Sequence, residues 1–391
     1  MANELAAVWI NPYTLEKSRT GGVIARLLSL STGKLVAARM FAPSRELVEE
    51  YSKLIVTKGS RESKIVREEI RRYIRNYWVP TPGVCDRPRV MMLLFQGNNI
   101  IRNLREHVVG PIWKGSVSGM TVRDTYGDYV KNARGEITYF EPAVLIIPEP
   151  ADAEPTLKLW ARYSDRDGGL LYNSCRYPAG VRPQTTLVLM KPENFRGQSS
   201  LAGNVMDIIS RTGLRIIGAK LIRMSVEQAE EFYGPVAEAL PERMKGRVIE
   251  TLKYCLRTSF DFPIPEEIYA KMADQLKDLK ARQEFHQIIQ GMTGLDPGET
   301  KGVKARRAPG KEKCLALIYQ GDRAVSRIRE VLGATDPTKA GWATIRRIYG
   351  HSINQNVAHA SDSPANVKRE MEIIRVEDNS LKKIIMEFYR K

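Results

Sequence analysis

The sequence predicts two α/β domains, each built around a mainly antiparallel sheet that helices cover. A chain of 391 residues is too long for one compact core, so two or three domains are expected. A strand–helix–strand segment near the start recurs from Thr186 onward, and a strand followed by a basic helix recurs farther along each half. The two copies of this unit therefore indicate two domains of the same fold.

The first part of each copy contains an apolar strand, a proline and an amphipathic helix. The first copy has AVWINPYTLEKSRTGGVIARLL, and the second has TLVLMKPENFRGQSSLAGNVMDII. In the second copy, four apolar residues recur at helical spacing: Leu201, Val205, Ile208 and Ile209. Gly33 and Gly213 are expected to end the two helices with a positive φ angle.

An alternating strand and a second helix follow in both copies. Ser44 and Ser225 stand before the acidic first turns of these helices and are predicted N-caps. Farther on, MMLLFQGNNIIRNLREHVVGP corresponds to CLALIYQGDRAVSRIREVLGATDP, and VRDTYGDY corresponds to IRRIYGHS. Three pairs of residues match in these segments: Arg105 with Arg329, Arg123 with Arg346, and Tyr126 with Tyr349.

The repeat predicts domain boundaries at 1–164 for the first copy and 184–391 for the second. The polar stretch 165–183, which contains glycine and proline, is the expected linker. The second copy alone has a helical insertion at about 236–312. Its apolar stripe is expected to be buried by simple packing and consists of Ile268, Met272, Leu276 and Leu279.

Composition and charge limit the classes of protein that the chain can represent. No apolar run of about 18 residues is present, so no transmembrane helix is expected. The N-terminus lacks a signal-peptide pattern, and the four cysteines form neither a zinc pattern nor a disulfide framework. A reducing, cytoplasmic setting is therefore predicted. The net charge of +16 favours polyanionic partners. Part of it lies in 301–313, which is either a solvated loop or a nucleic-acid contact.

The C-terminal stretch GATDPTKAGWATIRRIYGHSINQNVAHASDSPANVKREMEII resembles the active-site region of nucleoside diphosphate kinases. Together with the run Lys191-Pro192-Glu193-Asn194, this resemblance covers nearly all of the second copy. The segment from Asn356 to Ser363 is similar to the family's histidine signature, with Ala360 in place of the common glycine. The resemblance implies two ferredoxin-like domains, the first a degenerate copy and the second a complete one.

The resemblance implies that His359 carries phosphate between nucleotides in a ping-pong reaction, transferring the γ-phosphate of an NTP to an NDP. A histidine nucleophile needs one neutral ring nitrogen aimed at phosphorus and a partner for the other nitrogen. Glu370, eleven residues farther on, occupies the family's position for that partner. Mg²⁺ is expected to arrive on the nucleotide, so no metal ligands are predicted in the protein. His107, His286 and His351 are expected to have no catalytic role.

The resemblance also implies the residues that surround the nucleotide. Phosphoryl transfer needs chiefly positioning and positive charge around the phosphate oxygens. The family's nucleotide contacts correspond here to Lys191, Tyr233, Phe285, Arg329, Thr335, Arg346, Ile353 and Asn356. Lys191 is also placed among the catalytic residues, and Phe285 with Ile353 would hold the base. Ser361 and Asp362 are expected to shape the turn after the histidine.

The first copy keeps the repeat and lacks the reactive residues. Asn11 stands where the second copy has Lys191, and an apolar residue, Val144, is predicted at the histidine position. No P-loop motif occurs in the chain. A second hypothesis therefore remains open, namely a non-catalytic nucleotide- or nucleic-acid-binding regulatory protein on a kinase-like fold.

The resemblance implies assembly as well, because kinases of this family join sheets edge to edge in dimers. With both copies in one chain, we expect a pseudo-twofold dimer within the polypeptide, with a higher homo-oligomer as a further possibility. The runs from Lys34 to Phe41 and from Leu214 to Ile222 would then pair.

Overall fold

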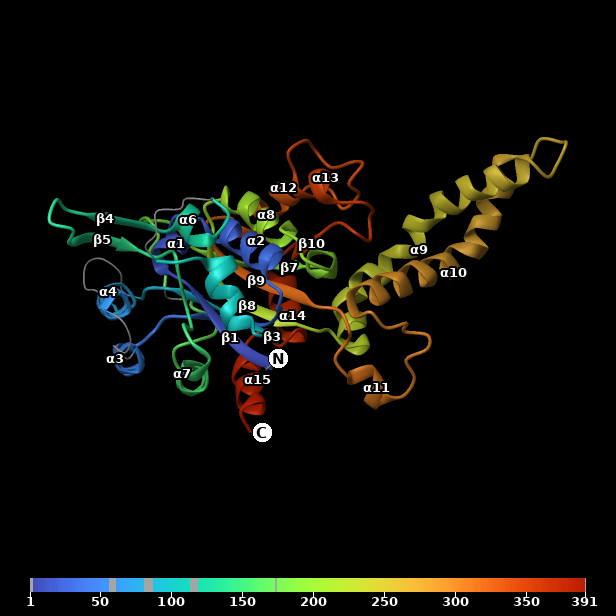
Figure 1. The fold of residues 1–391 in the computed structure, drawn as a ribbon. Coiled ribbons are helices and arrows are strands. Elements are labelled where there is room, and N and C mark those ends of the chain that lie inside the picture. Colours follow the sequence, from blue (N-terminus) through green and yellow to red (C-terminus); the bar gives the residue numbers. More distant parts are fainter. Residues whose placement is uncertain (1–2, 56–60, 81–86, 113–118, 173, 391) are drawn as a thin grey trace. The chain divides into compact units, whose positions relative to one another are not determined.

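The computed structural model describes residues 3–55, 61–80, 87–112, 119–172 and 174–390. The chain forms two compact units (Figure 1). The first unit comprises Met1–Ile222, Leu315–Met371 and Arg375–Lys391, and the second comprises Arg223–Cys314 with Glu372–Ile374. Both copies of the repeat therefore contribute to the first unit, and most of the helical insertion forms the second. Among the described residues, no helix is long and apolar enough to cross a membrane.

The N-terminal copy is built on a four-stranded sheet with the order β2-β3-β1-β6. Its strands are β1 (Asn3–Ile10), β2 (Lys34–Phe41), β3 (Val90–Asn98) and β6 (Val144–Ile146). Strand β1 pairs antiparallel with β3 and with β6, and β2 pairs antiparallel with β3. The six residues of β1 from Leu5 to Ile10 are all buried, because both faces of the central strands are covered.

Helices surround this sheet. They are α1 (Pro12–Glu16), α2 (Thr20–Leu30), α3 (Arg45–Leu54), α4 (Arg61–Tyr77), α5 (Ile100–Asn103), the π-helix η1 (Leu104–Val109), α6 (Val122–Tyr126) and α7 (Pro150–Tyr163). The predicted cap Ser44 is confirmed, since its side chain accepts a hydrogen bond from the Leu47 N–H. A separate antiparallel pair, β4 (Asp128–Lys131) and β5 (Ile137–Glu141), lies between α6 and β6 along the chain (Figure 1).

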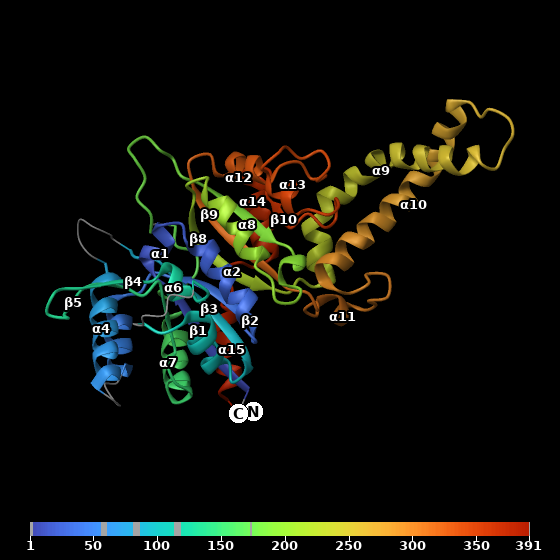
Figure 2. The same ribbon diagram turned by 45° about the horizontal axis from the view of Figure 1, so that its top comes forward.

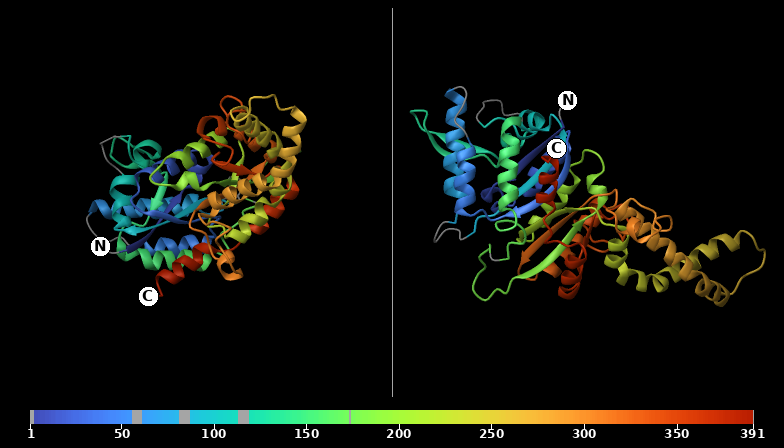
Figure 3. Two further views of the ribbon diagram at one scale, coloured as in Figure 1. Left: turned by 90° about the vertical axis from the view of Figure 1, so that its right-hand side faces the viewer. Right: turned by 90° about the horizontal axis from the view of Figure 1, so that it is seen from below.

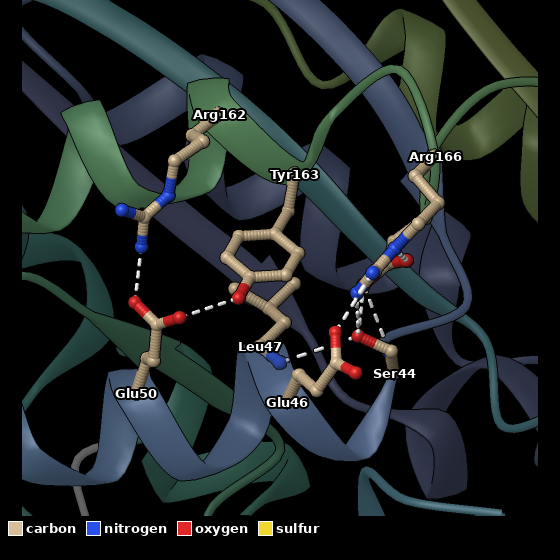
Figure 4. A network of polar contacts seen from close by, with 8 residues as sticks. Ser44, Glu46, Leu47, Glu50, Arg162, Tyr163 and Arg166 are labelled. Carbon is tan, nitrogen blue, oxygen red and sulfur yellow. Dashed lines mark hydrogen bonds and ion pairs between the residues drawn. The ribbon is translucent and has the colours of Figure 1, made fainter.

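A network of polar side chains joins α3 to the end of α7 (Figure 4). Glu50 accepts a hydrogen bond of 2.5 Å from the Tyr163 hydroxyl and forms an ion pair with Arg162. Arg166 donates to Glu46 and to the Ser44 hydroxyl, both at 2.7 Å. The residues around the predicted linker boundary therefore contribute to the packing of the N-terminal copy.

The C-terminal copy repeats the same sheet order, β10-β7-β9-β8. Its strands are β7 (Gln184–Met190), β8 (Arg215–Ile222), β9 (Cys314–Gly321) and β10 (Ala358–Ala360), and its first-unit helices are the 3-10 helix η2 (Pro192–Phe195), α8 (Leu201–Ser210), α12 (Ala324–Leu332), α13 (Ile345–Tyr349) and α14 (Pro364–Ile373). Numbered within each copy, both sheets have the order 2-3-1-4, which is the ferredoxin-like arrangement. The predicted fold class is confirmed.

The two sheets lie next to each other within the first unit. Strand β2 runs beside β8, and α2 packs against α8. A Cβ atom added to Gly21 would lie 2.6 Å from the Gly203 carbonyl oxygen, and one added to Gly203 would lie 2.3 Å from the Gly21 oxygen. Since Cβ atoms do not approach an oxygen so closely, only glycine allows α2 and α8 to come this near.

The C-terminal helix crosses between the copies. Helix α15 (Ser380–Phe388) follows the C-terminal copy in sequence and packs against α7 and β2 of the N-terminal copy (Figure 3). Asn379 caps α15 by accepting from the Lys382 N–H, and its side-chain amide donates to Asp165 at 2.6 Å. The N-terminal copy is therefore completed by a segment from the other end of the chain.

The second unit is an antiparallel helical hairpin of α9 (Val226–Arg257) and α10 (Glu266–Thr293), with the short helix α11 (Val303–Arg307) after it (Figure 2). The predicted cap Ser225 is confirmed by a complete capping box with Gln228. Leu240, Met244 and Ala281 form a small core within the hairpin.

Two sequence-based expectations are wrong in detail. The stripe expected to pack is largely exposed, with Ile268 at 43 %, Leu276 at 38 % and Leu279 at 60 % exposure, while α10 buries Tyr269 and Ala273 instead. Helix α2 ends at Leu30 with an extended Ser31 as its C-cap. Gly33 is instead required by close packing, since a Cβ there would lie 2.5 Å from the Ile100 Cδ1 atom. Gly213 has the expected positive φ of 71°.

The basic segment 301–313 is partly neutralised within its own unit. Arg306 forms an ion pair with Glu230, and Arg307 forms one of 2.9 Å with Glu227. Both carboxylates belong to the first turns of α9. These pairs reduce the positive charge that the segment presents to a polyanion.

Candidate active site

The candidate site of the C-terminal copy begins at the edge strand β10, which pairs with β7. His359 lies opposite Leu189 in this register, at the middle of the three-residue strand. Val357, two residues before His359, has a φ angle of +63°. A left-handed backbone is strained for a β-branched residue, and such strain persists only where neighbouring groups hold it.

The polar groups that hold this turn come from the loop after β7. The Val357 N–H donates to the Glu193 carboxylate at 2.9 Å, and the Asn194 side chain donates to the Val357 carbonyl oxygen at 2.7 Å. The Lys191 N–H donates to the same carbonyl oxygen at 3.0 Å. Sequence reasoning assigned no role to Glu193 or Asn194. The run Lys-Pro-Glu-Asn marks these two residues in the sequence. The sequence does not reveal that Val357, to which they bond, has a strained backbone.

His359 and Glu370 are in direct contact. The distance between the His359 Nε2 and Glu370 Oε2 atoms is 2.9 Å, and the Ser361 hydroxyl donates to the same Oε2 at 2.6 Å. Glu370 is buried in α14, while the His359 side chain is 22 % exposed. A carboxylate at Nε2 favours the tautomer that carries its proton there, so Nδ1 is the nitrogen with the lone pair. Arg369 lies 3.7 Å from the other oxygen of Glu370.

Lys191 and Asn356 form the second contact of the site. The Lys191 ammonium group donates to the Asn356 side-chain oxygen at 2.7 Å and to the Asn354 carbonyl oxygen at 3.1 Å. The Asn356 amide donates in turn to the carbonyl oxygens of Thr335 at 3.0 Å and Ile353 at 2.8 Å. Both side chains are buried. One asparagine thus links the lysine, the Thr335 loop and the segment before the histidine.

Arg346 ties the loop after α12 to the histidine strand. Its guanidinium donates to the carbonyl oxygens of Gly333 and Ala358, both at 2.9 Å. Arg329, on α12, is exposed, and its positive charge contributes to a lowered pKa of Asp362. The largest cause of that lowered pKa is the hydrogen bond from the Asn366 side chain to Asp362, 2.7 Å long.

Ser361 and Asp362 take different parts in the turn after the histidine. Ser361 is buried on Glu370, whereas Asp362 is exposed and bonded to the first turn of α14. Arg329 and Asp362 also line a surface cavity of about 520 Å³. Tyr233 and Phe285 belong to the second unit. There Tyr233 contacts the Phe232 ring, and Phe285 packs on the core of the hairpin. Their roles as nucleotide contacts stay predictions.

The N-terminal copy repeats the frame of this site with different side chains. Arg123 donates to the carbonyl oxygens of Gly110 at 2.7 Å and Val144 at 3.1 Å, as Arg346 does to Gly333 and Ala358. Ala143 has a φ angle of +59°, close to that of Val357. Asn11, at the position of Lys191, donates to the buried Glu141 at 3.1 Å.

The strand register corrects one prediction. Leu145 lies opposite Trp9 as His359 lies opposite Leu189, so Leu145 occupies the histidine position. Val144 corresponds to Ala358, one residue earlier. The β4–β5 pair lengthens this part of the N-terminal copy, so counting residues in the sequence placed the histidine position one residue too early.

Comparisons with known proteins find relatives of the C-terminal copy. The family model "Nucleoside diphosphate kinase" matches residues 184–240 and 309–379. The nucleoside diphosphate kinase of Kosmotoga olearia is 29% identical over 190 residues, which cover 49% of this chain and 87% of the relative. That of Staphylothermus marinus is 28% identical over 198 residues, covering 51% and 96%. The crystal structure of an NDP kinase from Pyrobaculum aerophilum aligns with 24% identity and a TM-score of 0.34, over 49% of this chain and 95% of that one.

The family match contains Lys191, Asn356, His359 and Glu370 and omits 241–308, which is most of the helical hairpin. The residues that are in contact in the site are therefore the ones that the match covers. Through its C-terminal half, the chain is similar to nucleoside diphosphate kinases.

Proposed function

We propose that the C-terminal copy is an active nucleoside diphosphate kinase that works through phospho-His359. The observation that carries the proposal is the 2.9 Å contact between His359 Nε2 and a buried Glu370. In the first half-reaction, the Nδ1 lone pair attacks the γ-phosphorus of an NTP. The bond from that phosphorus to the β–γ bridging oxygen breaks, and the NDP leaves with the electron pair. A second NDP then attacks the phosphohistidine and takes the phosphoryl group.

The surrounding cations are the second support for the proposal. Phosphoryl transfer depends mainly on positioning and on positive charge around the phosphate oxygens. Lys191, Arg329 and Arg346 would supply that charge, and the Thr335 hydroxyl would add a hydrogen bond. The ribose is assigned to Asn356 and the base to Ile353 and Phe285, with Tyr233 near the lysine. Mg²⁺ would arrive on the nucleotide and would offset part of its phosphate charge.

The setting and assembly of the protein are part of the same proposal. We infer a reducing, cytoplasmic setting, which the free thiols of Cys175, Cys255 and Cys314 support. The contacts of β2 with β8 and of α2 with α8 support a pseudo-twofold dimer within one chain. The predicted pairing of the runs at β2 and β8 is wrong, because these strands are the edges of two separate four-stranded sheets and are not hydrogen-bonded into one. Light scattering would give the mass of the particle and the number of chains in it.

The test of catalysis is phosphate labelling of two histidine variants. After incubation with γ-labelled ATP, the wild-type chain should carry an acid-labile, base-stable phosphate, and His359→Ala should carry none. His351→Ala is the matched control, because His351 is an exposed histidine in the same half and has no catalytic role in the proposal. Labelling of His359→Ala at the wild-type level would exclude His359 as the nucleophile.

A further inference from the structure

The N-terminal copy contains a cavity of about 580 Å³ at the position that corresponds to the catalytic site of the other copy. Ligand-binding pockets commonly enclose about 300–1,000 Å³. The cavity is lined by Leu145, the counterpart of His359, and by Arg105 and Arg123, the counterparts of Arg329 and Arg346. It therefore occupies a former phosphate-binding position rather than an incidental gap between helices.

The lining has changed from polar to apolar at successive positions. Counting from the aligned pair Leu145 and His359, the serine, aspartate and glutamate of the C-terminal copy are replaced. The replacing residues are Ile147 for Ser361, Pro148 for Asp362 and Thr156 for Glu370. Further apolar side chains come from α3, α4 and the loop after η1: Leu54, Ile55, Val66, Ile70 and Ile112. Covering such an apolar surface with a hydrocarbon is favourable, because it removes apolar area from water.

The lining also contains charged side chains, of which Arg105 and Arg123 have counterparts in the C-terminal copy. Arg67, Arg105 and Arg123 line the cavity together with two carboxylates, Glu149 and Asp152. The Arg105 guanidinium also pairs with Glu106 at 2.9 Å, outside this lining. The three guanidinium charges therefore balance Glu106, Glu149 and Asp152 while Asp152 is ionised, and one of them is in excess when Asp152 is protonated. A cavity with an apolar wall and that excess charge suits a ligand with one negative charge.

Arg67 and Asp152 lie close together without forming a hydrogen bond. Their closest atoms are 4.0 Å apart, which is an ion-pair distance and not a hydrogen bond. The Asp152 Oδ2 atom is buried and has no hydrogen-bond partner among the described residues. Burial raises the pKa of Asp152, so this carboxylate is neutralised more readily than an exposed one. A ligand head group with an oxygen between the two side chains would accept from Arg67, and a protonated Asp152 would donate to it.

We propose that this cavity binds an amphipathic monoanion, a hydrocarbon chain ending in a single carboxylate, with the head at Arg67 and the chain along Val66, Ile70 and Leu145. A nucleoside diphosphate does not suit the same space. It carries several negative charges and a polar ribose, whereas the position of Lys191 holds Asn11, and Asn11 is bonded to Glu141. The N-terminal copy is thus a ligand-binding domain for a different chemical class from the nucleotides of the C-terminal copy.

Calorimetric titration of the full chain with three ten-carbon probes tests the class of ligand. Decanoate should bind with one molecule per chain, and decanol should bind about tenfold more weakly because it lacks the charge. Decylamine should bind more weakly still, since its cation would face an excess of arginine. Saturating Mg-ADP should leave decanoate binding unchanged. Decanol or decylamine binding as tightly as decanoate, or displacement of decanoate by ADP, would overturn the proposal.

Two neighbouring substitutions on α4 locate the site. Val66 lines the cavity, whereas Ile65 is 47 % exposed and is not part of the lining. Val66→Glu should weaken decanoate binding at least about tenfold through like-charge repulsion, and Ile65→Glu should bind as the wild type does. Arg67→Gln should reduce the preference for decanoate over decanol. Equal losses in the two glutamate variants, with native circular dichroism in both, would place binding on the surface and refute the assignment.

Discussion

The two copies of the repeat share the same backbone arrangement around the site and differ in the side chains attached to it. In both, an arginine donates to a glycine carbonyl oxygen and to a carbonyl oxygen of the last strand, and the residue before that strand has a positive φ angle. Only the C-terminal copy adds a histidine on a buried carboxylate. The arginine and the strained turn are therefore retained in the copy that has Leu145 in place of the histidine, which indicates that they serve folding in both copies.

Each copy stabilises its left-handed residue with a glutamate from a different place in the chain. In the N-terminal copy the Ala143 N–H donates to Glu141, two residues earlier, at 3.0 Å. In the C-terminal copy the Val357 N–H donates to Glu193, from the loop after β7, at 2.9 Å. Glu141 also receives the side chains of Asn11 and Tyr73. In the N-terminal copy, Glu141 thus also bonds to Asn11, which stands at the position of Lys191.

The largest effect is expected when the C-terminal copy is given a residue of the N-terminal one. Glu370→Thr, which copies Thr156, should lower the rate of phosphate transfer by about 10²–10⁴, because His359 loses the carboxylate that sets its tautomer. A coupled assay of ADP formation measures the rate. Glu372→Thr is the control, since Glu372 is an exposed carboxylate two residues away. A loss below tenfold in Glu370→Thr would show that the contact between His359 and Glu370 is not the feature that distinguishes the two copies.

The matched arginines should differ in activity and agree in stability. Arg123→Met and Arg346→Met each remove two hydrogen bonds from a charged donor and should cost about 3 kcal/mol of unfolding free energy. Burial lowers the pKa of Arg123 to about 9, so the guanidinium stays charged at neutral pH. Urea denaturation measures stability, and transfer should fall only in Arg346→Met. Equal loss of transfer in both variants would assign a catalytic role to the N-terminal copy.

Arg39 of β2 and the corresponding Lys220 of β8 should differ in pH dependence. Burial, the largest cause, lowers the pKa of Lys220 to about 8, with Arg39 and Arg375 adding to the effect and Asp378 opposing it. The unfolded chain, with an ordinary lysine, then binds more protons above this pKa, so stability should rise with pH. We expect a gain of about 1–2 kcal/mol between about pH 8 and pH 10. Lys220→Met should abolish that gain in urea denaturation at the two pH values; an unchanged pH slope would show that Lys220 is not its source.

The smallest expected effect concerns the two strained turns. Ala143→Gly should stabilise the chain by up to about 1 kcal/mol, because glycine relieves a left-handed backbone at the cost of unfolded-state entropy. Val357→Gly should relieve more strain, since valine is β-branched. Thermal unfolding of the two variants compares them. A lower melting temperature in Ala143→Gly would mean that the entropy glycine adds to the unfolded chain outweighs the relief of backbone strain in this turn.

Local sequence patterns were sufficient for much of the fold. The alternation of strands and amphipathic helices, the serine caps of α3 and α9, and the repeat itself predicted two α/β domains with mainly antiparallel sheets, and the resemblance implied the ferredoxin-like arrangement. These features depend on neighbours within a few residues, which the sequence displays directly. The π-helix η1 shows the limit of this reasoning. It lengthens the path from Asn99 to Gly110 by one residue relative to that from Arg323 to Gly333, with no visible mark in the sequence.

Contacts between distant segments were decided by the tertiary structure alone. A strand register, such as Leu145 opposite Trp9, depends on how a sheet closes across more than a hundred residues, so residue counting placed the histidine position at Val144. The burial of Tyr269 rather than Ile268 on α10 depends on which face meets α9. The motif around His359 determined the candidate chemistry because its residue types are specific. The cavity of the N-terminal copy has no motif, since it results from apolar side chains that four separate segments bring together.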